Sequence, residues 1–313
     1  MRKTVRLTGA VAVIALAVAA TGCGGDDDGN GTQSQPFTLQ FAAVDGSNVV
    51  HCGDTMGGFG TSGTDSVEVS DFRLYVSNLR FDTTGGSSVS AKLDDNPFQY
   101  NDQNGSVALI DFTSTAAGAC TGGVTYAEGT ARTNTVITGT VAAKDIRGVR
   151  FDVGIPQRLM KTIIANHTAE DAPSPLAEMH WSWGFAYRFL VMNFVVADGS
   201  GAPGEGYVHV GSNDCGGDGT KALTDRDACG KPNAAAVALT SFDPAKNVVA
   251  VDVRELLAHL DFQVTPQDAP PVPGVECHSS SQQPDCATIF TNLGINQQTG
   301  SATAALNHVF KVR

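Results

Sequence analysis

The chain has two tryptophans, and both lie in the segment Pro175–Phe189, as Trp181-Ser182-Trp183. Alternate side chains of an extended segment share a face, so both indoles are expected on one side together with Met179. A native indole carries only an N–H donor and is therefore a poor metal ligand. On these residues alone, the tryptophans are interpreted as anchors of a hydrophobic core.

The histidines are the next residues able to do chemistry. His209 lies between Val208 and Val210 in an apolar run, which is unusual for a solvent-facing side chain. His167 ends a segment of helical pattern and precedes the loop that leads to the tryptophans. Two imidazoles and the thioether of Met179 would suit copper better than calcium or magnesium, because softer ligands select copper. Such a site requires the fold to bring these residues together.

Recognisable catalytic motifs are missing from the sequence. It contains no G-x-S-x-G nucleophile motif, no H-E-x-x-H zinc motif and no glycine-rich phosphate loop. Asp and Glu residues are numerous, but no motif pairs them for acid–base work. The sequence therefore predicts that the protein is not an enzyme. A hydrolase or another enzyme is kept as an alternative that no motif supports.

The N-terminus has the features of a bacterial lipoprotein signal. A basic start is followed by the apolar segment Val11–Ala20, which is too short to span a bilayer. The small residues before Cys23 resemble a lipobox, so residues 1–22 are predicted to be the signal peptide and Cys23 the lipidated residue. A plain signal peptide cleaved nearby is the alternative. Residues 23–36 are predicted to be a flexible acidic tether.

Location and charge restrict the partners. Gly24, in place of an Asp after Cys23, favours the outer membrane, so the predicted location is the bacterial cell envelope, lipid-anchored and facing the periplasm. Removing residues 1–22 leaves 17 Lys and Arg against 32 Asp and Glu, a net charge of −15. This acidity excludes nucleic acid as an expected partner and suits a cation or a basic protein.

The cysteines indicate an exported protein. Besides Cys23 there are six, an even number that suits an oxidising compartment. Pairing the cysteines that lie nearest in sequence predicts Cys215–Cys229 and Cys277–Cys286, which leaves Cys52–Cys120. Six cysteines allow fifteen pairings, so this assignment is a hypothesis.

Short alternating runs of apolar and polar residues dominate the rest of the chain, and clusters of Asn, Asp and Gly separate them. Each run is typical of a strand with one buried face. The pattern predicts an all-β fold, an antiparallel β-sandwich or barrel-like single domain over residues 37–313, with a few short helices and disulfides. Helices are expected in residues 156–167 and 253–260, and residues 266–284 are interpreted as a loop rich in Pro and Ser.

Six stretches occur in order between Ser70 and Cys215: SDFRLYVSNLRF, VALIDF, IRGVRFDVGIP, NHTAEDAPSPLAEMHWSW, YRFL and HVGSNDC. Together they resemble the MbnP-like family, the metallo-mystery pair four-Cys motif proteins. The resemblance implies an exported antiparallel β-protein, encoded beside a di-haem enzyme that resembles MauG and the cytochrome c peroxidases.

The resemblance also implies a chemistry. The di-haem partner would oxidise Trp181 or Trp183 to kynurenine, and the modified protein would bind copper. Kynurenine has an aryl amine and a ketone, so a side chain that could only donate gains a lone pair for a metal. Because His167, His209 and Met179 match family positions, the resemblance implies them as copper ligands.

A different class of function stays open. In that interpretation the protein is a structural or non-metal-binding lipoprotein of the cell envelope, and Trp181 and Trp183 anchor its core. Full burial of both indoles, with no histidine within reach, would favour it.

Overall fold

The structure, a computed structural model, describes residues 33–113, 133–168, 170–182, 186–215, 228–266 and 270–313. Residues Thr32–Arg313 form one compact unit. The predicted signal peptide, most of the tether and Cys23 lie outside the described residues. Strand β1 already begins at Gln35, which is inside the range assigned to the tether.

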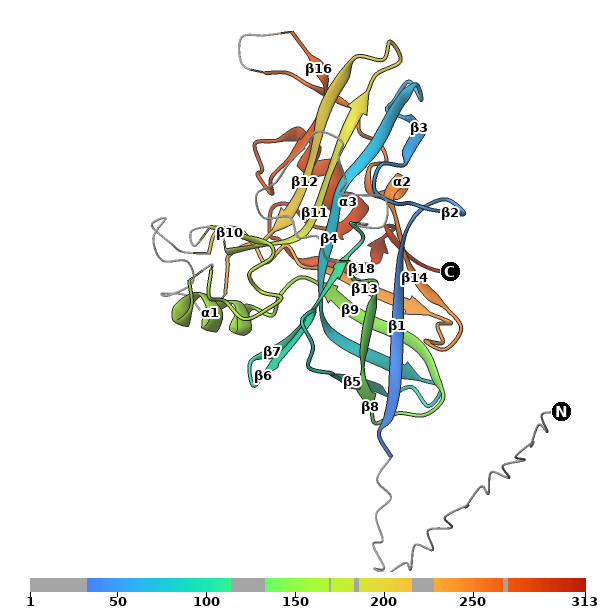
Figure 1. The fold of residues 1–313 in the computed structure, drawn as a ribbon, viewed down its shortest axis with the longest axis vertical. Coiled ribbons are helices and arrows are strands. Elements are labelled where there is room, and N and C mark those ends of the chain that lie inside the picture. Colours follow the sequence, from blue (N-terminus) through green and yellow to red (C-terminus); the bar gives the residue numbers. More distant parts are fainter. Residues whose placement is uncertain (1–32, 114–132, 169, 183–185, 216–227, 267–269) are drawn as a thin grey trace, which may run out of the picture. The chain divides into compact units, whose positions relative to one another are not determined.

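A curled, mixed sheet is the main feature of the fold (Figure 1). Within the described residues it has seventeen strands: β1 (Gln35–Asp45), β2 (Asn48–Val49), β3 (Thr55–Phe59), β4 (Asp65–Thr83), β5 (Ser88–Leu93), β6 (Gln99–Asp102), β7 (Gly105–Asp111), β8 (Val136–Val141), β9 (Ile146–Val153), β10 (His180–Ser182), β11 (Ala186–Ala197), β12 (Pro203–Gly211), β13 (Ala235–Thr240), β14 (Val248–Asp252), β15 (Gln263–Val264), β16 (Val272–Cys277) and β19 (Phe310–Val312). The all-β prediction is confirmed. Two pairings, β1–β14 and β12–β16, are parallel, which a purely antiparallel sandwich does not include.

Few elements are not part of this sheet. Strands β17 (Leu293–Ile295) and β18 (Ala302–Asn307) form a small sheet of their own. The helices of the described residues are α1 (Gln157–Asn166), α2 (Val253–Leu256) and α3 (Pro284–Asn292). None of them is long and apolar enough to cross a membrane.

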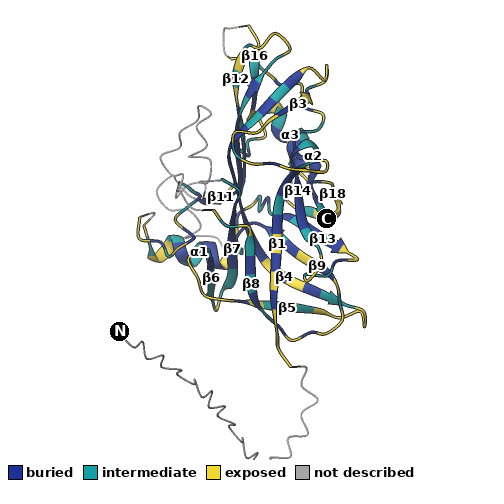
Figure 2. Ribbon diagram, turned by 45° about the vertical axis from the view of Figure 1, so that its right-hand side comes forward, coloured by how far each residue is buried: buried dark blue, intermediate teal, exposed yellow. Residues whose placement is uncertain are grey.

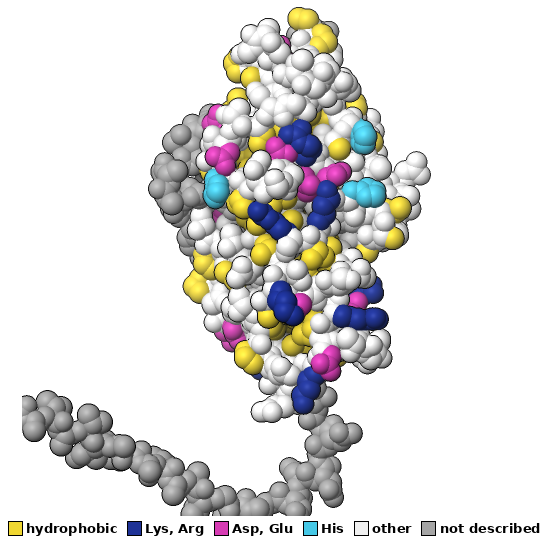
Figure 3. Space-filling view, turned by 90° about the vertical axis from the view of Figure 1, so that its right-hand side faces the viewer, with side chains coloured by type: hydrophobic (Ala, Val, Ile, Leu, Met, Phe, Trp, Pro, Cys, Tyr) yellow, Lys and Arg dark blue, Asp and Glu magenta, His cyan; other side chains and the backbone are white. Residues whose placement is uncertain are grey.

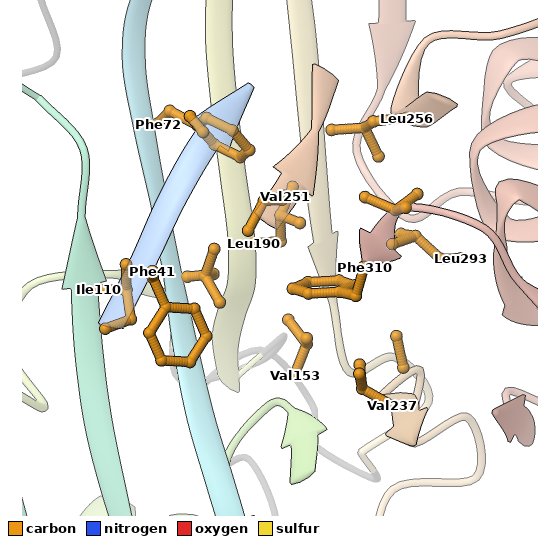
Figure 4. Packing of buried hydrophobic residues seen from close by; sticks show 14 of the residues in the cluster. Phe41, Phe72, Ile110, Val153, Leu190, Val237, Val251, Leu256, Leu293 and Phe310 are labelled. Atoms are coloured by element: carbon orange, nitrogen blue, oxygen red, sulfur yellow. The ribbon is translucent and has the colours of Figure 1, made fainter. Parts of the chain in front are cut away.

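The main hydrophobic cluster lies inside the curl of the sheet (Figure 4). Alternation predicted its members correctly in β1, where Phe37, Leu39 and Phe41 are buried and the residues between them are exposed. Phe151 packs edge-on against Phe41 and Phe310, with ring centroids 5.8 and 5.6 Å apart. These contacts join β1, β9 and β19 across the core.

Strand β4 pairs with β11 and is buried on both faces in its middle (Figure 2). Phe72 and Leu74 belong to the main cluster, whereas Tyr75 belongs to a smaller cluster that packs under α1. The alternating face that carries Tyr75 also carries Asp71 and Arg73, and both are buried. Because buried polar groups must find partners inside the protein, this face has to hold an internal hydrogen-bond network.

Helix α1 confirms the predicted helix at residues 156–167, but the predicted helix at 253–260 is wrong in length. Helix α2 ends at Leu256, although Leu257 and Leu260 are buried as its pattern suggested. The backbone at His259 is left-handed, with φ of 66°, which a right-handed helix does not accommodate.

The interpretation of residues 266–284 as a loop is also wrong. They contain β16, whose backbone pairs with β12 in parallel register. Pro273 and Gly274 hide the strand in the sequence because both are unfavourable in strand interiors.

Two predicted disulfides, Cys215–Cys229 and Cys277–Cys286, are present. The third predicted pairing involves Cys120, which lies outside the described residues. On the face shown in Figure 3, basic side chains lie among acidic ones and do not form a continuous basic patch.

Candidate functional site

Two histidines lie side by side on neighbouring strands. The parallel register of β12 and β16 pairs Val208 with Cys277, so the next residues, His209 and His278, are adjacent. Their Nδ1 atoms are 2.9 Å apart and their ring centroids 4.7 Å apart. His209 is only 2% exposed, whereas His278 is half-buried. The two Nδ1 atoms therefore meet where the buried side chain of His209 approaches the half-buried side chain of His278.

The indole of Trp181 lies against this pair. Strand β10 places it there by pairing with β11, and its ring centroid is 6.4 Å from those of both His209 and His278. Tyr207 lies two residues before His209 on β12, on the same face of the strand. The centre of its ring is 6.0 Å from that of His209 and 5.7 Å from that of His278. Trp181 is half-buried, so the site is reachable from solvent.

Electrostatics keep both imidazoles neutral. Burial, helped by His278 and by the positive charges of Arg188 and Arg73, lowers the pKa of His209 to about 2. Burial also lowers the pKa of His278, although the carboxylate of Glu276 opposes the shift. Neutral imidazole is the form that binds metals. At neutral pH neither ring therefore has to lose a positive charge before a metal can bind.

The surroundings of the other predicted ligands are different. Met179 is fully buried in the smaller hydrophobic cluster, and its carbonyl accepts a hydrogen bond from the backbone N–H of Arg188. His167 follows α1, where its Nδ1 lies 3.7 Å from a carboxylate oxygen of Asp171. Trp183 lies outside the described residues. The structure thus joins Trp181 to His209, but it gives His167 a local acidic partner.

Sequence reasoning missed His278 because its segment was interpreted as a loop. The local signal was weak: a histidine directly after a cysteine, in Glu276-Cys277-His278, with a second cysteine nine residues further on. Only the pairing of β16 with β12 shows that this histidine faces His209.

A single metal ion would fit the Nδ1 atoms. With metal–nitrogen bonds of about 2.0–2.1 Å, two ligands at a right angle lie about 2.9 Å apart. The described residues contain no group of three or more His, Cys, Asp or Glu that could hold a metal ion.

The curled sheet and the neutral imidazole pair beside a tryptophan define a class of all-β proteins, and comparison with known proteins gives the family. A family profile described as MbnP matches residues 34–279, a range that includes Trp181, His209 and His278. The chain belongs to the MbnP family, as its motifs predicted.

A solved structure supports this assignment. MbnP from Methylosinus trichosporium is similar to this chain at 25% sequence identity, with a TM-score of 0.69, over 90% of this chain and 98% of that one. No curated protein matches the chain.

Proposed function

We propose that this protein binds copper between His209 and His278, after a di-haem enzyme has oxidised Trp181 to kynurenine. The observation that carries the proposal is the contact of the Trp181 ring with two neutral imidazoles whose Nδ1 atoms are 2.9 Å apart. Imidazole nitrogens suit copper, and membership of the MbnP family agrees with a role in copper binding.

The oxidation would supply a further nitrogen donor beside the two imidazoles. It would break the indole C2–C3 bond and add two oxygen atoms, a four-electron oxidation that balances with two hydrogen peroxide molecules supplied to the di-haem partner and two water molecules released. Hydrolysis then releases C2 as formate. The remaining aryl amine has a lone pair, unlike the indole N–H. The net change is the loss of one carbon and the gain of one oxygen.

The half-exposed position of Trp181 supports this proposal over a purely structural role. A core anchor would be fully buried and would need no histidine beside it, whereas Trp181 has two. In the proposed setting, Cys23 carries a lipid, residues 23–36 tether the domain, and the protein faces the periplasm from the outer membrane. The protein is then the substrate of the di-haem enzyme and not an enzyme itself.

The test is to produce the full chain with and without its di-haem enzyme in the same host. Peptide mass spectrometry then examines the tryptic peptide of residues 162–188, which contains Trp181 and Trp183. We expect loss of one carbon and gain of one oxygen at Trp181, and one bound copper, only with the enzyme. An unmodified peptide and equal copper in both samples would contradict the proposal and favour the structural lipoprotein.

A further inference from the structure

A row of buried polar side chains leads from the middle of the sheet to His209. The Asn193 amide oxygen Oδ1 lies 2.8 Å from Nε2 of His209, and its Nδ2 lies 3.4 Å from Oδ2 of Asp71. The Arg73 guanidinium holds Asp71 in two hydrogen bonds, Nε to Oδ1 at 2.8 Å and Nη2 to Oδ2 at 2.6 Å. Asn193 is completely buried, and Asp71 and Arg73 are 7% and 2% exposed.

Sheet register builds this row. Asn193 of β11 is paired with Asp71 of β4, while Val191 of the same strand is paired with His209 of β12. The side chains of Asp71, Asn193 and His209 lie on the face opposite the main hydrophobic cluster, so the row runs across neighbouring strands.

The Asp71–Arg73 ion pair determines which way the Asn193 amide is turned. A carboxylate held by an arginine can only accept hydrogen bonds, so the NH₂ group of Asn193 must face Asp71. A rotated amide would set its oxygen against the carboxylate. The Asn193 oxygen therefore faces His209 and accepts a hydrogen bond, which requires the proton of His209 on Nε2. The lone pair of His209 is then on Nδ1, toward His278.

We propose that Asn193 is a positioning residue that selects this tautomer of His209, with its own orientation set by the Asp71–Arg73 ion pair. The inference rests on the proposed copper site, whose ligand atom on His209 is Nδ1. Outer partners of this kind fix the ring and the tautomer of a ligating histidine.

The selected tautomer also defines the state of His278 before a metal binds. Because Nδ1 of His209 carries a lone pair, the 2.9 Å contact is a hydrogen bond donated by Nδ1–H of His278. A metal at Nδ1 would require that proton to leave, and the ring would stay neutral if water carried the proton from Nδ1 to Nε2. Glu276 is placed to stabilise it, with Oε1 3.9 Å from Nε2.

The experiment compares the wild type with Asn193→Leu, which has a similar volume and no acceptor. Asn292→Leu is the matched control, because Asn292 is also buried but donates to the carbonyls of Leu256 and Ala258. Imidazole 15N shifts of the metal-free protein, made without the di-haem enzyme, report the tautomer of His209. Copper affinity is then measured on the oxidised protein.

We expect Nε2–H at His209 in the wild type and in Asn292→Leu, and a mixture of tautomers in Asn193→Leu. Copper affinity should fall about 10- to 100-fold in Asn193→Leu alone, the usual effect of losing an outer partner. A wild-type His209 protonated on Nδ1 would overturn the inference, even if the variant does not fold. An unchanged tautomer and affinity in Asn193→Leu would do the same. The expected tautomer without any copper binding would instead contradict the proposed function.

Discussion

The Nδ1 atoms of His209 and His278 are 2.9 Å apart, although 69 residues separate them in the chain. The parallel pairing of β12 with β16 makes them neighbours, and the Cys277–Cys286 disulfide holds the segment after β16 against α3. Their separation is thus set by sheet register and not by a flexible loop. This rigidity suits a metal site, whose ligands must be held in place before the ion arrives.

Replacing His278 tests the proposed ligand pair directly. His278→Ala should lower the copper affinity of the oxidised protein at least about tenfold, which corresponds to about 1.4 kcal/mol. His167→Ala is the matched control, because His167 lies beside Asp171. Competition with a chromophoric copper chelator measures both. Loss of affinity in His167→Ala with a normal His278→Ala would show that the originally predicted ligand is the correct one.

The two tryptophans can be separated by substitution. Trp181→Phe should abolish both the mass change and copper binding, because the Trp181 ring is the one beside the two imidazoles. Trp183→Phe should retain the modification at Trp181. Mass spectrometry of the peptide of residues 162–188 distinguishes the sites. A modification found at residue 183 would assign the donor to the other indole.

The loop that leads to Trp181 is anchored by Tyr75. Its buried hydroxyl donates a hydrogen bond of 2.7 Å to the carbonyl of Pro175. Tyr75→Phe removes this hydrogen bond, although the carbonyl still accepts one of 3.1 Å from the backbone N–H of Glu178. The substitution should cost about 0.5–1.5 kcal/mol of the free energy of unfolding. Tyr187→Phe is the matched control, because the Tyr187 hydroxyl is buried with no hydrogen-bond partner in the described part of the chain. Urea unfolding should show Tyr187→Phe to be neutral or stabilising; equal losses would contradict this role of Tyr75.

Asp111 should make stability depend on pH. Burial raises the pKa of its carboxyl from 3.8 to about 7. A raised folded-state pKa means that the folded protein keeps a proton that the unfolded chain has lost. The contribution of this proton to the free energy of unfolding is complete below about pH 4 and is lost as the pH rises through about 7.

Asp111→Asn should remove this loss. At about 1.36 kcal/mol per pKa unit, the variant should gain roughly 2–4 kcal/mol over the wild type between about pH 4 and pH 8. Urea unfolding at both pH values measures the difference. The same pH dependence in both proteins would show that Asp111 is not the group responsible.

Local patterns predicted the parts of the fold that depend on local physics. Alternation in residues 37–41 identified β1, because one face of that strand is buried and the other is exposed. The buried middle of β4 is different: Asp71 and Arg73 are polar residues on a buried face, so alternation does not show why they are there. They can be buried because they form hydrogen bonds with each other and with Asn193, which belongs to another strand.

The sequence by itself determined the family, the all-β class and two disulfides, and it proposed Trp181 and His209 as site residues. Motif order, strand periodicity and cysteine spacing are properties of short segments, so they can be recognised without knowledge of the fold. The tertiary structure alone decided that His278 faces His209 and that His167 pairs with Asp171. The register of β16 on β12 joins segments far apart in the chain, and no local pattern records which strands will pair.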